Sequence, residues 1–495
     1  MVKCRRQRWV FLLVFFFTVF MNSVNFSNGH EISLGTKLEL IHRHDRNLHN
    51  EVQPTSQLER LTQLLRSDTV RLNSISQKLS LNHRRTSTNR RNVQEGTTIY
   101  NLACTNGTRI SNLNVSGEMS MNSGADFGTG QYFVHFEIGS PVQKLVLIAD
   151  TGSDLTWMNC KYRCRGGGKC MRSLNKRGTF RADISSSFRT FPCSSRMCKV
   201  KLSDLFSLAR CPSAKDLCAY DYRYSDGSSA IGLFAEEKVT FTLTNGRKAR
   251  LHNVLVGCSE STNGRSLQIA DGIMGLGYSN YSFALKAAKK FGGKFSYCLV
   301  DHLSPNNVSS YLIFGSHNDT SLKLNKIRYT ELVLGVLRQF YALNIKGISI
   351  GGTMLDIPHE VWNVNGVGGT ILDSGTSLTS LAPQAYEPVM AALKKSLSNF
   401  SNLNLDIGQL EYCFNSTGFN ESSVPRLTFH FEDGARFRPA VKSYVIDVDV
   451  GVKCLGLVLA SWPGPSVIGN IMQQNYFWEF DLKNSRLGFG SSTCI

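Results

Sequence analysis

A four-residue motif that occurs twice constrains this chain more than any other feature of its sequence. The first copy is Asp150-Thr151-Gly152-Ser153, and the second is Asp373-Ser374-Gly375-Thr376. Each copy follows a short apolar run, so each aspartate is expected where a buried strand ends. A buried carboxylate is costly unless it is paired, hydrogen-bonded or protonated. Two such aspartates with the same flanks therefore suggest one shared explanation.

The residue types in the motif suit acid–base chemistry. The glycine allows a tight turn and a close approach to another segment, and the neighbouring hydroxyls can donate to carboxylate oxygens. If the two turns meet, carboxylates about 3 Å apart cannot both ionise easily, and they share one proton. One carboxylate could then take a proton from water while the other gives a proton to a carbonyl, which predicts peptide-bond hydrolysis. A single copy would more often be a surface turn, but two matched copies disfavour that alternative.

On these motifs the chain resembles the pepsin-like aspartic proteases, and more closely their plant nepenthesin-like branch. The resemblance covers residues 128–495 strongly and the segment before them weakly. It implies an all-β, bilobal pepsin-like fold, with two β-barrel-like lobes and the active cleft between them. It also implies an aspartic-type endopeptidase that works at acidic pH, with Asp150 and Asp373 binding the nucleophilic water. The shared proton is a known property of that family, which the resemblance brings with it.

The resemblance assigns supporting roles to the remaining motif residues. Ser153 and Thr376 match hydroxyls that bond the outer carboxylate oxygens. Thr151 and Ser374 match a pair that reaches across between the lobes, and Gly152 and Gly375 shape the two turns. Further along each half, the sequences at 271–277 and 467–470 match strands that thread behind the catalytic turns.

A turn-rich hairpin at residues 222–232 resembles the flap that closes over substrate in this family. Tyr224 stands at the flap tyrosine position, Ser225 and Asp226 would contact the substrate backbone, and Trp157 would be the hydrogen-bonding partner of Tyr224. The usual glycine after the tyrosine is Ser225 here, which puts the mobility of the flap and its main-chain contacts in doubt. Without the motif, Tyr224 would be one more aromatic residue on a β-hairpin.

Cysteine usage indicates an oxidising compartment. Of the 14 cysteines, Cys4 and Cys104 precede the lobes, and the remaining 12 suit six disulfides. The cysteines clustered between 160 and 218 lack the paired spacing typical of a zinc site, so no metal is expected. The resemblance implies the pairs Cys160–Cys164, Cys170–Cys258, Cys193–Cys218, Cys198–Cys211, Cys298–Cys494 and Cys413–Cys454, of which Cys298–Cys494 would tie the lobes together.

Four segments are expected along the chain. Residues 1–28 have basic residues before an apolar run of about 13 residues, which predicts a signal peptide, with a signal anchor as the alternative. Residues 29–119 are expected to be a propeptide. Its apolar residues at helical spacing between Leu58 and Leu79 could dock on the next domain or bind a membrane. Residues 120–325 would form the N-terminal lobe, with the Cys-rich insert and the flap, and residues 326–495 the C-terminal lobe.

The family's propeptides cover the cleft, and their basic side chains hold the carboxylates inactive until the pH falls. We therefore expect the chain's own propeptide to act as its inhibitor. The lobes should be rich in short strands, with helices expected at 281–290 and 383–397. No cofactor, no stable membrane span and a monomer are expected.

Export is also indicated by the glycosylation sequons. Eight acceptor asparagines follow the expected signal peptide at residues 1–28: Asn106, Asn114, Asn280, Asn307, Asn318, Asn399, Asn415 and Asn420. The expected location is extracellular, in the apoplast or cell wall, with the vacuole as the alternative.

The formal net charge of +18 suits pectic cell walls, anionic surfaces or nucleic acid. Because no compact Lys/Arg run follows residue 120, the sequence favours a dispersed basic surface. Two alternatives to a secreted protease remain. One is an inactive binding protein like the plant xylanase inhibitors, which the intact motifs disfavour. The other is a protease associated with nucleic acid, which the signal peptide and sequons disfavour.

Overall fold

The computed structural model describes residues 58, 62, 65, 68, 71, 72, 75, 79, 117–123, 131–162, 178–202, 205, 209–224, 228–243, 246–264, 267, 270–301, 310–315, 327–405 and 407–494. Several expectations lie outside the described residues. These are the signal peptide, the flap residues Ser225 and Asp226, Cys164 and Cys170, and the sequons at Asn106, Asn114, Asn307 and Asn318.

Strands dominate the described part of the chain, as the alternating apolar pattern predicted, and the fold is all-β and pepsin-like. The strands up to residue 314 are β1 (Gly117–Ser123), β2 (Tyr132–Ile138), β3 (Gln143–Asp150), β4 (Trp157–Lys161), β5 (Phe180–Arg181), β6 (Arg189–Thr190), β7 (Ala209–Arg210), β8 (Ala219–Arg223), β9 (Ser229–Thr242), β10 (Lys248–Asn263), β11 (Gly272–Gly275), β12 (Lys294–Cys298) and β13 (Ser310–Phe314).

A second series of strands follows residue 327. They are β14 (Arg328–Gly335), β15 (Arg338–Leu343), β16 (Ile345–Ile350), β17 (Thr353–Met354), β18 (Thr370–Leu372), β19 (Thr379–Leu381), β20 (Asn402–Leu403), β21 (Cys413–Asn415), β22 (Leu427–Phe431), β23 (Arg436–Phe437), β24 (Val445–Asp449), β25 (Val452–Leu455), β26 (Leu457–Leu459), β27 (Ser466–Ile468), β28 (Tyr476–Asp481) and β29 (Arg486–Ser491).

The two halves repeat one arrangement around their motifs. β3 ends at Asp150 and pairs in parallel with β11, which also pairs antiparallel with β4. In the second half, β18 ends one residue before Asp373 and pairs in parallel with β27, which also pairs with β19. Both threading strands were predicted from the sequence. Because β11 and β18 are fully buried, the aspartate next to each of these strands lies in the interior of the protein.

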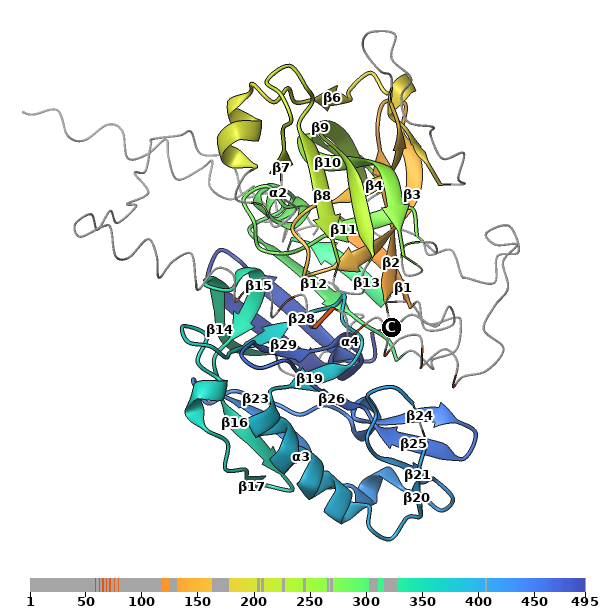
Figure 1. Ribbon diagram of the computed structural model, residues 1–495, viewed down its shortest axis with the longest axis vertical. Helices are drawn as coiled ribbons and strands as arrows, with labels where there is room; N and C mark the ends of the chain where they lie inside the picture. Colours follow the sequence, from red (N-terminus) through yellow and green to blue (C-terminus); the bar gives the residue numbers. More distant parts are fainter. Residues whose placement is uncertain are drawn as a thin grey trace, which may run out of the picture. The chain divides into compact units, whose positions relative to one another are not determined.

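One antiparallel sheet connects the two halves. It runs through β1, β13, β12, β28, β29 and β14 in successive hydrogen-bonded pairs. Figure 1 lets the reader follow β12 and β28 lying side by side although they are far apart in sequence. The pairing of β12 with β28 holds the C-terminal segment of the chain against the first half.

The two longer helices lie where the sequence predicted them. α2 (Phe283–Lys290) begins after Ser282, whose side chain accepts a hydrogen bond from the Leu285 amide, and α3 (Pro383–Ser396) begins with a proline. α4 (Asn470–Gln473) was not predicted, because four residues are too few for a helical pattern. Short turns of 3₁₀ or π helix are η2 (Ala182–Ile184), η3 (Met197–Lys201), η5 (His359–Val361), η6 (Glu421–Ser423) and η7 (Val441–Ser443).

The described positions of the pro-segment between Leu58 and Leu79 are helical. Leu65, Leu72 and Ile75 are buried in a cluster with Phe340 and other side chains of the second half. The apolar spacing therefore reflects docking on the lobe. Among the described residues, no helix is both long and apolar enough to cross a bilayer.

Five disulfides join described cysteines, and two match the implied pairs. Cys298 joins Cys494, and Cys413 joins Cys454 across β21 and β25. The implied pairs Cys160–Cys164 and Cys170–Cys258 are wrong, because Cys160 bonds Cys258. The parallel pairing of β4 with β10 brings the Cα atoms of those two residues to 5.0 Å.

The pairs Cys193–Cys218 and Cys198–Cys211 are also wrong, because the structure joins Cys193 to Cys211 and Cys198 to Cys218. Antiparallel β7 and β8 bring Cys211 and Cys218 together, and backbone hydrogen bonds lay residues 191–193 along 216–218. All four sulfurs thus form one cluster, with the Sγ atoms of Cys198 and Cys211 only 3.1 Å apart. Small shifts decide the partners in such a cluster. Because these sulfurs are bonded to one another, they do not form the zinc site that the sequence analysis considered.

The four sequon asparagines in the described part, Asn280, Asn399, Asn415 and Asn420, are exposed. The Oδ1 atoms of Asn415 and Asn420 accept hydrogen bonds from the hydroxyl and amide of the third sequon residue, Thr417 and Ser422 respectively.

Candidate active site

In the first motif, the residues that follow Asp150 hold its carboxylate. Asp150 is only 1% exposed at the end of β3. The Gly152 amide donates to its Oδ1 at 2.9 Å, and the Ser153 hydroxyl donates to its Oδ2. These donors replace water and fix the direction in which the carboxylate points.

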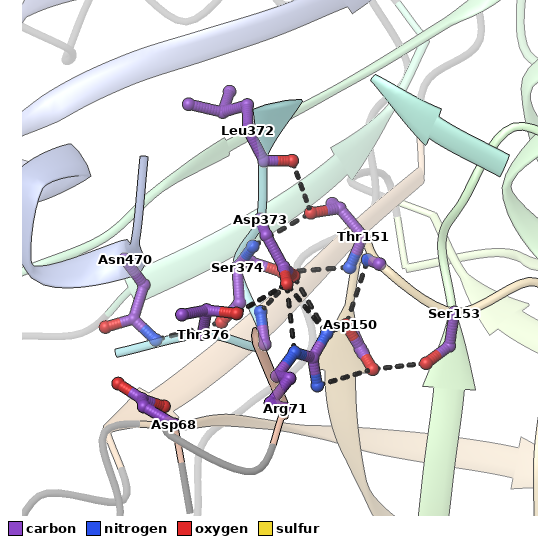
Figure 2. Close-up of polar contacts among 12 residues, drawn as sticks. Asp68, Arg71, Asp150, Thr151, Ser153, Leu372, Asp373, Ser374, Thr376 and Asn470 are labelled. Atoms are coloured by element: carbon purple, nitrogen blue, oxygen red, sulfur yellow. Dashed lines mark hydrogen bonds and ion pairs between the residues drawn. The ribbon is translucent and has the colours of Figure 1, made fainter. Parts of the chain in front are cut away.

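The second turn repeats this pattern. Asp373 is fully buried, the Gly375 amide donates to its Oδ1 at 2.9 Å, and the Thr376 hydroxyl donates to its Oδ2 at 2.6 Å. The hydroxyls of Ser153 and Thr376 therefore lie where the resemblance placed them. Figure 2 shows both turns converging on one point from opposite sides.

Reciprocal hydrogen bonds join the two turns. The Ser374 amide donates to Thr151 Oγ1 at 2.9 Å, and the Thr151 amide donates to Ser374 Oγ at 3.1 Å. Each hydroxyl also reaches a carbonyl on the far strand, with Thr151 donating to Leu372 and Ser374 to Ala149. This network couples the ends of β3 and β18, so the two carboxylates are positioned together.

The motif glycines let the turns approach each other. A Cβ atom on Gly375 would lie 2.2 Å from Asp150 Oδ1, and a Cβ atom on Gly152 would lie 2.9 Å from Asp373 Oδ1. Each glycine thus faces the carboxylate of the opposite motif. Any larger residue would push the two acids apart.

Arg71, from the helical pro-segment, lies between the two aspartates (Figure 2). Its Nη2 is 2.6 Å from Asp150 Oδ1, and its Nε donates to Asp373 Oδ2 at 2.9 Å. A second bond joins Nη2 to Asp373 Oδ1 at 3.0 Å. One guanidinium therefore makes charge-assisted hydrogen bonds to both acids.

Asp68 anchors the same segment one helical turn earlier. It is buried, and its carboxylate accepts hydrogen bonds from the backbone amides of Ser377 and Leu378 at 2.7–3.1 Å. Those residues directly follow the second motif. Asp68 and Arg71 are three positions apart and thus lie on one face of the helix, which docks against the second turn and the dyad together.

Burial and charge oppose each other at these acids. At Asp150, burial raises the pKa, but the charge and hydrogen bonds of Arg71, with those from Ser153 and Gly152, outweigh it and hold the pKa below its usual value. At Asp373, burial dominates and the pKa is raised, although the charge of Arg71 lowers it and the charge of Asp150 raises it. Burial also raises the pKa of Asp68 to about 7, against the two backbone amides and Arg71.

Three further side chains that sequence reasoning missed support the turns. Asn470 donates to the Ser374 carbonyl at 2.9 Å, and Gln473 donates to the Asp373 carbonyl at 3.2 Å. At the first turn, Gln339 reaches across from β15 of the second half and donates to the Gly152 carbonyl at 3.3 Å. Asn470 is the last residue of the 467–470 match, which was the one sequence signal available for these three side chains.

Tyr224 and Trp157, the expected flap tyrosine and its partner, contact each other in the structure. Trp157 Nε1 donates to the Tyr224 hydroxyl, and the Tyr224 ring stacks on Tyr222 with centroids 4.6 Å apart. Both tyrosines lie in or next to β8, and Trp157 begins β4, close behind the first catalytic turn. Their contact with substrate stays a prediction.

Comparisons with known proteins agree with this geometry. The family model described as xylanase inhibitor N-terminal matches residues 132–316, and the one described as xylanase inhibitor C-terminal matches residues 340–491. Aspartyl protease family protein 2 of Arabidopsis thaliana is 32% identical over 380 residues, which are 76% of this chain and 73% of that protein. Aspartic proteinase nepenthesin-1 of Nepenthes gracilis is 29% identical over 392 residues, 77% of this chain and 82% of that protein.

Solved structures share the fold at lower identity. Basic 7S globulin from soybean is 18% identical with a TM-score of 0.59, and the match covers 77% of this chain and 97% of that one. The structure described as edgp is 20% identical with a TM-score of 0.62 and covers 78% of this chain and 97% of that one. These matches extend the fold assignment across both halves.

Proposed function

This chain belongs to the plant nepenthesin-like branch of the pepsin-like aspartic proteases and is an aspartic-type endopeptidase, and we propose that it is made as a secreted zymogen that works at acidic pH. The observation that carries the proposal is the contact of Arg71 with both Asp150 and Asp373. The two buried carboxylates are close enough for one guanidinium to bridge them, which supports their acting as one acid–base pair.

In the proposed reaction, the two acids divide the proton transfers. The pair shares one proton. The ionised carboxylate takes a proton from water while the water oxygen attacks the peptide carbonyl carbon. The other carboxyl gives its proton to the carbonyl oxygen. The first carboxyl then gives the proton that it took from water to the nitrogen as the C–N bond breaks. A hydroxyl of the tetrahedral intermediate returns a proton to the second carboxylate, so that the pair again shares one proton. The proton belongs to the coupled dyad rather than to either residue alone.

Latency follows from the same geometry. While the Arg71 guanidinium bridges the dyad, it uses the carboxylate oxygens that the attacking water and the carbonyl would need. Its charge also favours ionisation of both acids, whereas catalysis requires one proton on the pair. We propose that residues 29–119 are the propeptide that supplies this arginine, and that acidification followed by cleavage removes it.

The remaining proposals concern export and form. Residues 1–28 would be the signal peptide, and the exposed asparagines at 280, 399, 415 and 420 would carry glycans. We propose an extracellular monomer with a peptide or protein substrate, and the vacuole as the alternative location. Tyr224, Ser225, Asp226 and Trp157 would form the flap over the substrate.

The test is cleavage of a quenched peptide by the expressed precursor after acid treatment, from about pH 3 to pH 7. Wild type should cleave at the acidic end, and pepstatin should inhibit it. Asp150→Asn and Asp373→Asn should each abolish cleavage while the thermal unfolding transition is retained.

Two results would contradict the proposal. Cleavage that survives either substitution would place the activity elsewhere. A folded wild type that is inert after its pro-segment has been removed would favour an inactive binding protein, the alternative suggested by the names of the matching family models.

A further inference from the structure

The second lobe gathers arginines that the sequence leaves scattered. Arg328 begins β14, Arg426 precedes β22, Arg436 begins β23, and Arg438 follows it. All four side chains are exposed. We call these four residues the arginine face, and we propose that it binds an acidic polysaccharide with repeating carboxylates, a polyuronate.

Strand alternation places the arginines on one side of a sheet. In β22, Leu427, Phe429 and Phe431 are buried in the core, so strand alternation places Thr428 and the half-buried His430 on the opposite face of the strand. Arg426 continues that row, which includes His430. His430 lies opposite Arg436 in the antiparallel pair of β22 and β23.

The same logic applies to β23. Phe437 is buried between Arg436 and Arg438, so both arginines share the outward side. Arg328 joins them from β14, where its Nη1 donates to the Arg436 carbonyl at 3.5 Å. The arginine face therefore extends from β22 and the edge strand β23 to the beginning of β14.

Four depressions cover this surface, and Arg438 lines all of them. Their volumes are ≈ 930, ≈ 510, ≈ 410 and ≈ 140 Å³. Arg426 lines two of the four depressions, Arg328 lines two, and Arg436 lines three. Shared lining residues make the depressions neighbours, so an extended ligand could pass over several arginines.

The positive charge of the arginine face is not neutralised by ion pairs. None of the four arginines pairs with an acidic side chain in the part of the chain that the structure describes. Two acids do line the depressions: Glu421 at the rim, and Asp433, which accepts hydrogen bonds from the backbone amides of Glu331 and Ala435.

Burial and the nearby charges of Arg436, Arg438 and Lys346 lower the pKa of His430, which agrees with several cations lying close together.

A polyuronate fits this surface for three reasons. A guanidinium presents a planar fork of donors that matches a carboxylate. Carboxylates that repeat along a chain can engage several arginines at once. Tyr476 lines two of the depressions and offers a ring beside Arg438 that could pack against a sugar. None of the catalytic residues lines these depressions, so the inference stands independently of the proposed function.

The test measures binding of a defined oligogalacturonate to wild type and to R436Q/R438Q. The matched control is R189Q/R250Q, which removes the same charge from two exposed arginines of the first half. We expect R436Q/R438Q to bind at least about tenfold more weakly, because two charge-assisted contacts are lost. The control should stay within about twofold, and binding should weaken as salt rises toward about 0.15 M. Thermal unfolding shows that each variant is folded.

Several outcomes would overturn the proposal. Equal losses in both double variants would indicate diffuse charge attraction. Equal binding of the fully methyl-esterified oligomer would show that carboxylates are not recognised. Tighter binding of DNA of equal charge with the same arginine dependence would reassign the surface to nucleic acid.

The assay is repeated after enzymatic deglycosylation, because Asn420 lies beside Glu421 at the rim. Failure to bind in both forms would also count against the proposal.

Discussion

At the scale of single residues, the dyad depends on two positions where no side chain fits. A Cβ atom on Gly375 would meet both Asp150 Oδ1 at 2.2 Å and Arg71 Nη2 at 2.5 Å. Gly375→Ala should therefore displace the opposite carboxylate. Because a shift of about 1 Å can cost about 100-fold in rate, we expect kcat to fall at least that far.

The control for Gly375→Ala is Gly418→Ala, at a surface turn where a Cβ atom would meet nothing within 4 Å. Gly418 has φ of +76°, so its substitution should cost about 1 kcal/mol of stability through backbone strain and leave kcat unchanged. Peptide cleavage and urea unfolding measure both. A fully active Gly375→Ala variant would contradict the close approach of the two turns.

Among the elements, the helix that carries Arg71 would account for the proposed acid activation. The charge of Arg71 lowers the pKa of both Asp150 and Asp373 in the docked state. The docked pKa of Asp150 lies below its usual value because of Arg71, so release raises the Asp150 pKa, takes up a proton there and becomes more favourable as the pH falls. Arg71→Gln should make the precursor active at a higher pH than wild type, while Arg71→Lys keeps the charge and should shift it less. Peptide cleavage measured against pH checks this, and an unchanged profile for Arg71→Gln would refute it.

Asp68 on the same helix has the opposite effect. In the docked helix, the pKa of Asp68 is raised from 3.8 to about 7. Between these two pH values, Asp68 therefore holds a proton while the helix is docked and loses it when the helix is released. Acidification through this window therefore favours docking at Asp68 and offsets the effect of the dyad. Release of the helix should therefore take up as much as about one more proton in Asp68→Asn than in wild type. The number of protons is read from the slope of the logarithm of the release constant against pH.

Asp68→Ala provides the structural comparison for that experiment. It leaves the amides of Ser377 and Leu378 without their acceptor, which costs about 1–3 kcal/mol per buried donor. Docking of the helix should weaken at every pH in Asp68→Ala. The slope of the release constant against pH should be close to that of Asp68→Asn. Identical slopes in wild type and Asp68→Asn would show that Asp68 does not titrate in this window.

At the scale of the whole molecule, the disulfide between Cys298 and Cys494 closes the longest loop among the described disulfides. It spans 196 residues, whereas Cys413–Cys454 spans 41. If disulfides act mainly by restricting the unfolded chain, the longer loop should contribute about 1 kcal/mol more. The free energy of unfolding should thus fall further in C298A/C494A than in C413A/C454A, as measured by urea denaturation. A larger loss in C413A/C454A would contradict this account.

The molecule also shows which expectations depended on local pattern. Asp150 and Asp373, their hydroxyl partners, the threading strands and helices α2 and α3 could be predicted, because each is encoded in a few adjacent residues. Arg71 and Asp68 could not be singled out, because every polar position of an amphipathic helix has the same local signal. The pairings of Cys160, Cys193 and Cys198 failed for a related reason: which sulfurs meet depends on strand neighbours far apart in sequence.

The dyad chemistry was predictable from two matched motifs behind apolar runs, because each motif is local in sequence. The all-β bilobal fold was predictable through the resemblance of the chain to the pepsin-like aspartic proteases. The tertiary contacts were needed to show which side chain bridges the two acids, which cysteines pair, and where four of the arginines gather. Arg328 and Arg438 are distant in sequence yet line two of the same depressions. The physical reason is that strand pairing sets such neighbours through backbone hydrogen bonds and core packing, which specify register without regard to the side chains that face outward.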